Sequence, residues 1–181
     1  FFGSLSLLVL IIQLLTGIWL AMYYTPTAEG AFASVEYIMR DVHYGWLLRY
    51  AHAVGASALF LVVYLHIFRS LLYGSYKKPR ELVWLLGVAL YVVLTAEAFM
   101  GYLLPWGQMS YWAAQVVISL FSAIPWIGEA LATWIRGDYT ISGVTLNRFF
   151  ALHVIGLPLI WLGLVWLHIW ALHAVGANKP D

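Results

Sequence analysis

Hydrophobic residues gather in four long runs along the chain, separated by stretches of mixed polarity. The runs cover roughly residues 1–24, 46–74, 82–104 and 147–174. A helix needs about 20 mostly apolar residues to cross the hydrocarbon core of a bilayer, and each run is long enough. The pattern therefore predicts an all-α protein built on a transmembrane four-helix bundle.

Shorter apolar stretches lie between the third and fourth runs, at 109–121 and 126–136, with Pro125 between them. They are too short to span a bilayer, so we expect interfacial helices along one membrane face, with a smaller one at 31–42. The chain has 10 Trp and 12 Tyr residues, many near the ends of runs. Such aromatic belts are typical of the headgroup level of a membrane.

Composition supports a membrane protein, since 64% of the 181 residues are hydrophobic and only 9% are charged. A soluble domain carries about 25% charged residues. The net charge of +1 gives no reason to expect a nucleic-acid partner, and lipid is the expected surroundings. Because there is no cysteine, disulfides, cysteine-bound iron–sulfur clusters and covalent haem attachment are excluded within this chain.

Basic residues gather on one side of the predicted bundle. They are Arg69 near the end of the second run, Lys77, Lys78 and Arg80 in the short connection that follows it, and Lys179 after the fourth run. The positive-inside rule places this side on the inner face of the membrane and the long connection 105–146 on the outer face.

Four of the six histidines lie inside the runs, where ionisable residues are expensive and usually functional. His52 and His66 are 14 residues apart, so on a helix they share a face and lie roughly 21 Å apart along the axis. His153 and His168 are 15 residues apart, and we expect Pro158 to distort that helix enough to absorb the extra residue.

The second and fourth runs should run in the same direction. His52 then lies level with His153 near the outer face (the outer pair), and His66 with His168 near the inner face (the inner pair). Two imidazoles at each of two levels indicate two b-type haems, non-covalently bound, with these histidines as iron ligands. A zinc or copper site needs ligands much closer together. A lone buried histidine would more often bond a neighbouring helix, but the repeated spacing favours haem.

Glycines repeat the 14-residue spacing of His52 and His66, and three arginines lie within five residues of the histidines. Gly17 and Gly101 match the outer level, and Gly3 and Gly87 match the inner level. We expect these glycines to let a flat macrocycle approach the backbone, although small-residue helix packing is the ordinary alternative. As propionate partners we expect Arg49 and Arg148 at the outer haem and Arg69 at the inner haem; interfacial snorkelling is the alternative.

Several stretches together resemble the amino-terminal haem-binding half of cytochrome b from bacterial cytochrome bc complexes, the ubiquinol–cytochrome c reductases. They are residues 3–5, 15–17, 44–52, 66–69, 101–110 and 148–153. The resemblance covers essentially the whole chain, 1–181, and implies that the carboxy-terminal half is absent from it. It also implies a low-potential haem at the outer pair and a high-potential haem at the inner pair. Phe1 and Phe2 stand where the chloroplast-type branch carries a haem-binding cysteine, which favours the bacterial type.

The resemblance further implies two sites for the substrate quinone or quinol. The outer, quinol-oxidising site would include Phe99, Tyr102, Pro105, Trp106, Gly107, Met109 and Ala113. Ala113 replaces a usual glycine and would narrow this site. The inner, quinone-reducing site would use His173, near Ala177 and Lys179, which depart from the usual polar ending.

The function implied is that of a dihaem electron-transfer subunit of quinol–cytochrome c oxidoreductase, coupled to proton translocation. It would be active only with a Rieske iron–sulfur protein, a c-type cytochrome and the carboxy-terminal part of cytochrome b. We expect a homodimeric complex in the bacterial inner membrane. Rival readings are a stand-alone dihaem anchor and a transporter whose histidines line a proton path. Glu97, inside the third run, is either a proton-relay member or a hydrogen-bonded buried acid.

Overall fold

The computed structural model describes residues 1–178, and the elements found there are all helical. The helices are α1 (Phe2–Ala21), α2 (Ala31–Arg40), α3 (Gly45–Leu72), α4 (Glu81–Leu103), α5 (Gln108–Ser122), α6 (Gly128–Arg136), α7 (Gly143–Ala151) and α8 (Leu157–Val175), with a π-helical turn, η1 (Leu152–Gly156), joining the last two. The all-α prediction is confirmed. Lys179, used above to orient the bundle, lies outside the described residues.

Four helices are long and apolar enough to cross a membrane, and they coincide with the four predicted runs. They are α1, α3, α4 and the continuous helix Gly143–Val175 formed by α7, η1 and α8. The last one begins four residues earlier than the predicted start at 147. Its N-terminus is set by Ser142, whose side chain accepts a hydrogen bond from the Val144 amide while Thr145 bonds back to the Ser142 amide. This capping box satisfies two amides that a helix start leaves unpaired.

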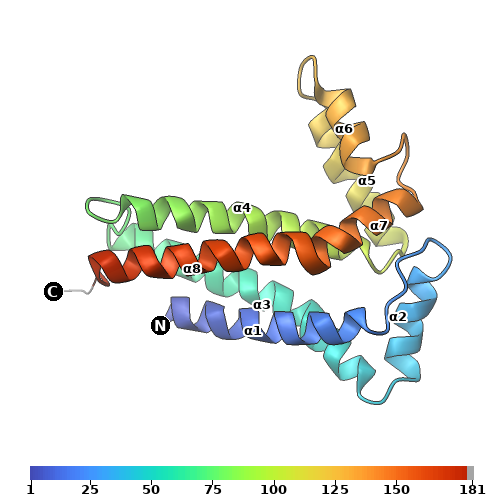
Figure 1. Ribbon diagram of the computed structural model, residues 1–181, viewed down its shortest axis with the longest axis horizontal. Coiled ribbons are helices and arrows are strands. Elements are labelled where there is room, and N and C mark those ends of the chain that lie inside the picture. Colours follow the sequence, from blue (N-terminus) through green and yellow to red (C-terminus); the bar gives the residue numbers. More distant parts are fainter. Residues whose placement is uncertain (179–181) are drawn as a thin grey trace.

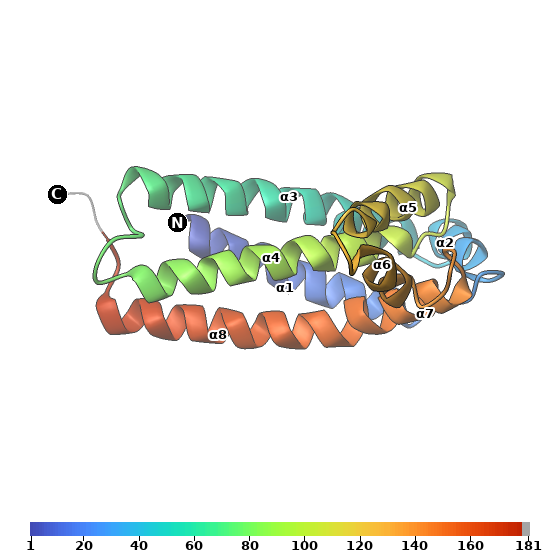
Figure 2. The same ribbon diagram turned by 90° about the horizontal axis from the view of Figure 1, so that it is seen from above.

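The bundle consists of two helix pairs, because α1 packs against α3 and α4 packs against α8. Seen from two directions at right angles, the four long helices run side by side along one axis (Figures 1 and 2). Helices α2, α5 and α6 turn away from that axis at one end of the bundle, α5 and α6 on one side and α2 on the other. The connection between α3 and α4, the start of α1 and the end of α8 lie at the other end.

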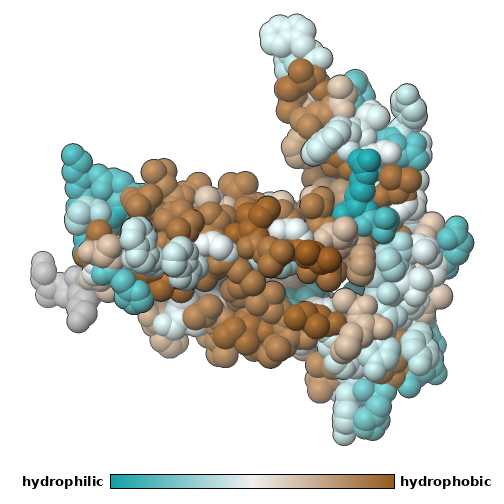
Figure 3. All heavy atoms as spheres, viewed as in Figure 1, coloured by the Kyte–Doolittle hydropathy of each residue, from teal (hydrophilic) through white to brown (hydrophobic). Residues whose placement is uncertain are grey.

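Hydrophobic residues cover the length of the bundle and give way to polar residues at both ends on the face seen in Figure 3. Large side chains such as Leu61 and Val92 are each 60% exposed along the spans. A water-soluble protein of this size does not present such a surface. The band therefore fits a bundle surrounded by lipid, with the interfacial helices at one of the polar ends.

Two buried clusters hold this arrangement together. One joins α4, α5, α6 and α7 at the end of the bundle, and comprises Leu103, Ala114, Ile118, Ala132, Ile141 and Phe149. The other lies halfway along the bundle and takes one residue from each spanning helix: Leu10, Leu59, Leu94 and Trp161. We call this second cluster the central layer. It separates the bundle into two ends, each of which contains one of the histidine levels.

Candidate functional site

The outer pair joins α3 to the π-helical turn. The imidazole rings of His52 and His153 face each other with centroids 6.2 Å apart and planes at 87°. Only 17% of the His153 side chain is exposed. Helix α3 and the turn η1 therefore bring these two histidines to one level, as their spacing in the sequence predicts.

The inner pair repeats the arrangement toward the other end of the bundle. The rings of His66 on α3 and His168 on α8 have centroids 6.3 Å apart, with planes at 74°. The two pairs thus have nearly the same ring separation. This holds although His153 and His168 are 15 residues apart in the sequence, whereas His52 and His66 are 14 apart. Two like sites are stacked along the bundle axis, one on each side of the central layer.

Both separations fit two imidazoles on opposite sides of one metal ion. An imidazole nitrogen binds a first-row metal at about 2.0–2.1 Å, and the ring centre lies about 1.1 Å further back, which gives centroids about 6.3 Å apart. Among the described residues, no group of three or more His, Cys, Asp or Glu side chains converges as a metal cage would require. Two facing imidazoles alone suit the axial positions of a haem iron, whose other ligands come from the macrocycle.

Hydrogen bonds fix which ring nitrogen is free in the outer pair. Nδ1 of His52 lies 2.9 Å from the hydroxyl of Thr16 on α1. Nδ1 of His153 lies 2.9 Å from the main-chain oxygen of Glu97 on α4, and 3.0 Å from its carboxyl oxygen Oε1. A metal-binding histidine usually bonds through its other nitrogen in this way. Nε2 of each ring is thereby left free to bind a metal.

The four glycines lie against the histidine rings, each on the helix paired with that histidine. A Cβ added at Gly17 would come within 3.0 Å of Cε1 of His52, and one at Gly87 within 3.3 Å of Cε1 of His168. At Gly3 the distance to Cε1 of His66 would be 3.4 Å, and at Gly101 the Cβ would collide with the His153 ring. The assignment of two glycines to each level agrees with this geometry. The imidazole is the nearest neighbour of each glycine, and the approach of a macrocycle to the backbone at these positions stays a prediction.

The π-helical turn accounts for the unequal spacing on the two helices. Residues Leu152–Gly156 form it, so His153 lies inside the turn and Pro158 follows two residues after it. A π-helical turn takes in one residue more than an α-helical turn. The extra residue between His153 and His168 is thus absorbed, and the local distortion expected near Pro158 is present.

Comparison with known proteins agrees with this arrangement. The family described as "Cytochrome b/b6/petB" matches residues 1–176. The chain belongs to the cytochrome b family. It is 64% identical over its full length to a cytochrome b of Allochromatium vinosum, and 56% identical over 179 residues to one of Arabidopsis thaliana.

A solved structure shows the same fold. The chain superposes on a protein chain of a "Hyperthermophilic respiratory Complex III" with a TM-score of 0.92 and 41% identity, over 99% of this chain and 48% of that one. It covers 44% of the length of the Allochromatium relative. This cytochrome b chain therefore spans about half the length of its relatives, corresponding to the haem-binding half that the sequence resembles.

Two of the three arginines, Arg69 and Arg148, contact protein groups in this cytochrome b. Arg69 bonds the main-chain oxygen of Asn178 and lies 4.6 Å above the ring of Tyr73. Arg148 donates to the main-chain oxygen of Trp134, 2.9 Å away, and so holds the end of α6 against α7. Arg49 is partly buried one helical turn before His52. Their roles as propionate partners stay predictions.

A shallow hollow of about 340 Å³ lies where α4 gives way to α5. It is lined by Trp106, Gly107, Gln108, Tyr111 and Trp112. Trp106 and Gly107 were expected in the outer quinol site. Gln108 and Tyr111 were missed, although Gln108 belongs to the same sequence stretch, and its Oε1 accepts a hydrogen bond from Trp112 at 3.0 Å.

The other residues expected around quinone do not line this hollow. Phe99 packs edge-on against Phe149 in the cluster between α4 and α7, with ring centroids 5.4 Å apart. Tyr102 and Met109 are 48% and 75% exposed, while Pro105 and Ala113 are partly buried. His173, expected at the inner quinone site, lies exposed near the end of α8. Ala177 is likewise exposed just beyond that helix.

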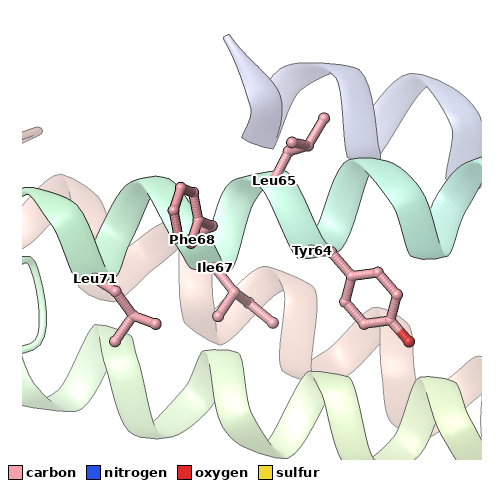
Figure 4. Close-up of a pocket in the computed structure, with 5 residues that line it drawn as sticks. All are labelled: Tyr64, Leu65, Ile67, Phe68 and Leu71. Atoms are coloured by element: carbon pink, nitrogen blue, oxygen red, sulfur yellow. The ribbon is translucent and has the colours of Figure 1, made fainter.

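A second hollow, of about 390 Å³, runs along α3 (Figure 4). Its lining residues Tyr64, Leu65, Ile67, Phe68 and Leu71 all belong to that one helix. Binding pockets combine apolar walls with a few converging polar groups, and here the Tyr64 hydroxyl is the only polar side-chain group of the lining. We assign no ligand to this apolar surface.

Proposed function

We propose that this chain holds two non-covalently bound b-type haems, one between His52 and His153 and one between His66 and His168. The supporting observation is the pair of ring separations, 6.2 and 6.3 Å, each of which would suit two imidazoles that hold one iron between them. The two levels lie roughly 21 Å apart along α3 at 1.5 Å per residue. Two such sites stacked across an apolar bundle form a path for electrons through the membrane.

The chain's own groups supply binding and orientation, while the haem when bound supplies one-electron chemistry. Thr16 and Glu97 bond the Nδ1 atoms of the outer pair and so would leave the Nε2 atoms to hold the iron. The glycines keep the rings close to the neighbouring backbone. The central layer is at least 93% buried, with exposures of 3, 3, 4 and 7%, so it keeps water from the space between the levels.

We further propose that the chain works in a quinol–cytochrome c oxidoreductase coupled to proton translocation, in a bacterial inner membrane. Quinol would be oxidised near the hollow at Trp106 and Tyr111, and quinone would be reduced near His173. A Rieske protein, a c-type cytochrome, the carboxy-terminal part of cytochrome b and a second copy of the complex would be its partners. Family membership and the fold shared with a respiratory Complex III chain support this proposal.

The structure favours this function over the two rivals. A proton path would need titratable groups at short intervals, whereas the histidine levels are separated by the apolar central layer. A stand-alone dihaem anchor would have little use for α5, whose first turns line the hollow at Trp106 and Gly107.

The experiment that tests the haem sites is a set of histidine substitutions in the full-length protein. H52A and H153A should remove the same b-type species from the reduced-minus-oxidised spectrum, and H66A and H168A should remove the other. H43A is the matched control, since His43 stands between α2 and α3, outside both pairs, and it should keep both species. The proposal would be contradicted if the two variants of one pair removed different haem species, or if both species survived in H153A.

A further inference from the structure

Glu97 carries a carboxyl group in the spanning part of α4, directly beside the outer pair. Its Oε1 lies 3.0 Å from Nδ1 of His153, and the carboxyl side chain is only 16% exposed. The second oxygen, Oε2, is buried and has no hydrogen-bond partner among the described residues. An incompletely paired acid inside a membrane span is costly, so the position calls for a function.

The side chain is not needed to satisfy the histidine. The main-chain oxygen of Glu97 already accepts from Nδ1 of His153 at 2.9 Å. Any residue at position 97 would provide that carbonyl. The carboxyl therefore adds a second acceptor, able to carry negative charge, to a ring nitrogen that is already bonded.

The inner pair has the same backbone arrangement without the carboxyl. Val83 precedes Gly87 by four residues, as Glu97 precedes Gly101, and its carbonyl faces His168. Nδ1 of His168 is buried without a hydrogen bond of normal geometry to any described residue. The nearest acid along α4 is Glu81, six residues before Gly87 or about 9 Å along the axis.

Along α3, by contrast, positive charge is matched between the levels; a further arginine, Arg148, lies five residues before His153 and is bonded to the main-chain oxygen of Trp134. Arg49 precedes His52 by three residues and Arg69 follows His66 by three, so each pair has one arginine a turn away on α3. Among the described residues, Glu97 has the only carboxyl group in contact with one of the four paired histidines, so it is the charged group that distinguishes the outer level from the inner one.

We propose that Glu97 is a positioning residue that acts through Nδ1 of His153 and makes iron at the outer pair harder to reduce than iron at the inner pair. This inference rests on the proposed haem sites. A carboxylate bonded to a ligating imidazole makes the ring a stronger electron donor, which favours the oxidised metal. An electron that arrives at the outer level is then driven toward the inner level.

The test is a redox titration of the full-length protein in its native complex, with each haem followed by its own absorption band. E97Q keeps the size and the main-chain acceptor but removes the charge. At the ambient potential that half-reduces the wild-type outer haem, we expect about a tenfold higher ratio of reduced to oxidised outer haem, or 59 mV for one electron. The inner haem should not shift. E97L should behave like E97Q, and E97D should restore part of the wild-type value.

A reciprocal variant carries the carboxyl to the other level. V83E, with Glu97 intact, should lower the reduced-to-oxidised ratio of the inner haem about tenfold at its own midpoint and leave the outer haem unshifted. A wild-type protein without two haem species would refute the proposed function itself. If both species are present, a ratio of reduced to oxidised outer haem that stays within twofold of wild type in E97Q and E97L would overturn the role of Glu97. Loss of the outer haem in both E97Q and E97L would also overturn this role. The carboxyl would then be needed to hold the His153 ring in place, and not to set how easily the outer iron is reduced.

Discussion

The indole Nε1 of Trp161 donates a hydrogen bond to the main-chain oxygen of Leu90, 3.2 Å away. This bond ties α8 to α4 between the two histidine levels, since Trp161 follows His153 by eight residues and precedes His168 by seven. Leu59 lies seven residues from each histidine of α3 in the same layer. The packing that holds the bundle together therefore also separates the two sites.

Replacing Trp161 should destabilise the bundle in proportion to the volume removed. W161A should cost about 3–5 kcal/mol, because it leaves a cavity in the central layer. W161F keeps most of the ring and loses one donor, so it should cost about 0.5–1.5 kcal/mol. The measurement is thermal unfolding of the purified full-length protein, followed by circular dichroism. W166A is the control, because Trp166 on the same helix is 67% exposed; equal midpoints for W161A and W166A would count against a central role for this layer.

Alanine substitution of the four glycines should damage the sites in a graded way. The Cβ of G101A would collide with the His153 ring, and that of G17A would meet the His52 ring at 3.0 Å. G87A and G3A, at 3.3 and 3.4 Å, leave more room. We expect the outer haem content to fall severalfold in G101A and clearly in G17A, and the inner haem content to change little in G87A and G3A. Haem absorption per protein measures this directly.

Gly163 provides the internal control for this series. A Cβ at that position would meet nothing within 4 Å, and alanine is the better helix former. G163A should therefore keep both haems and be as stable as the wild type or slightly more so. Equal haem contents across all five variants would show that ring contact is not why these glycines are needed.

Much of the site follows from spacing alone, because a helix repeats every 3.6 residues and places residues 14 apart almost on one face. The pairing of His52 with His153 and of His66 with His168, and the level of each glycine, needed no other information. Apolar length predicted the four spans for the same reason. These features are set along single helices.

Features that depend on how two helices are rotated against each other were not predictable. Glu97 was recognised as a buried acid, but its contact with His153 arises from the facing of α4 and η1. Arg148 is directed to the end of α6 by the α5–α6 hairpin, which brings the Trp134 carbonyl within reach. Tyr111 lines the hollow at the start of α5 because the chain turns sharply at Trp106, where φ is +56°.

The π-helical turn makes a prediction about deletions. Removing Ile155 from η1 would leave 14 residues between His153 and His168, the spacing found on α3. The turn should relax to a regular α-helix, and both haem species should remain in the spectrum. Inserting one alanine after Leu59 is the matched change on α3, where the helix is regular. It would rotate His66 by about 100° relative to His52, so one haem species should be lost. The reverse outcome, loss in the deletion and tolerance of the insertion, would contradict this account of η1.

Tyr24 gives the fold a dependence on alkaline pH. Its hydroxyl donates to the main-chain oxygen of Leu104 at 2.6 Å and its ring stacks on Phe150, so it ties the segment after α1 to the end of α4. Burial raises the pKa of the Tyr24 hydroxyl above its ordinary value. Because the folded pKa is the higher one, the stabilisation is complete below about pH 10, the unfolded value, and declines as the pH rises above it. Y24F should unfold about 0.5–1.5 kcal/mol more easily near neutral pH, and this difference should shrink above about pH 10. Thermal midpoints of both proteins across that range measure the effect, and a difference that stays constant with pH would contradict the assignment to this hydroxyl.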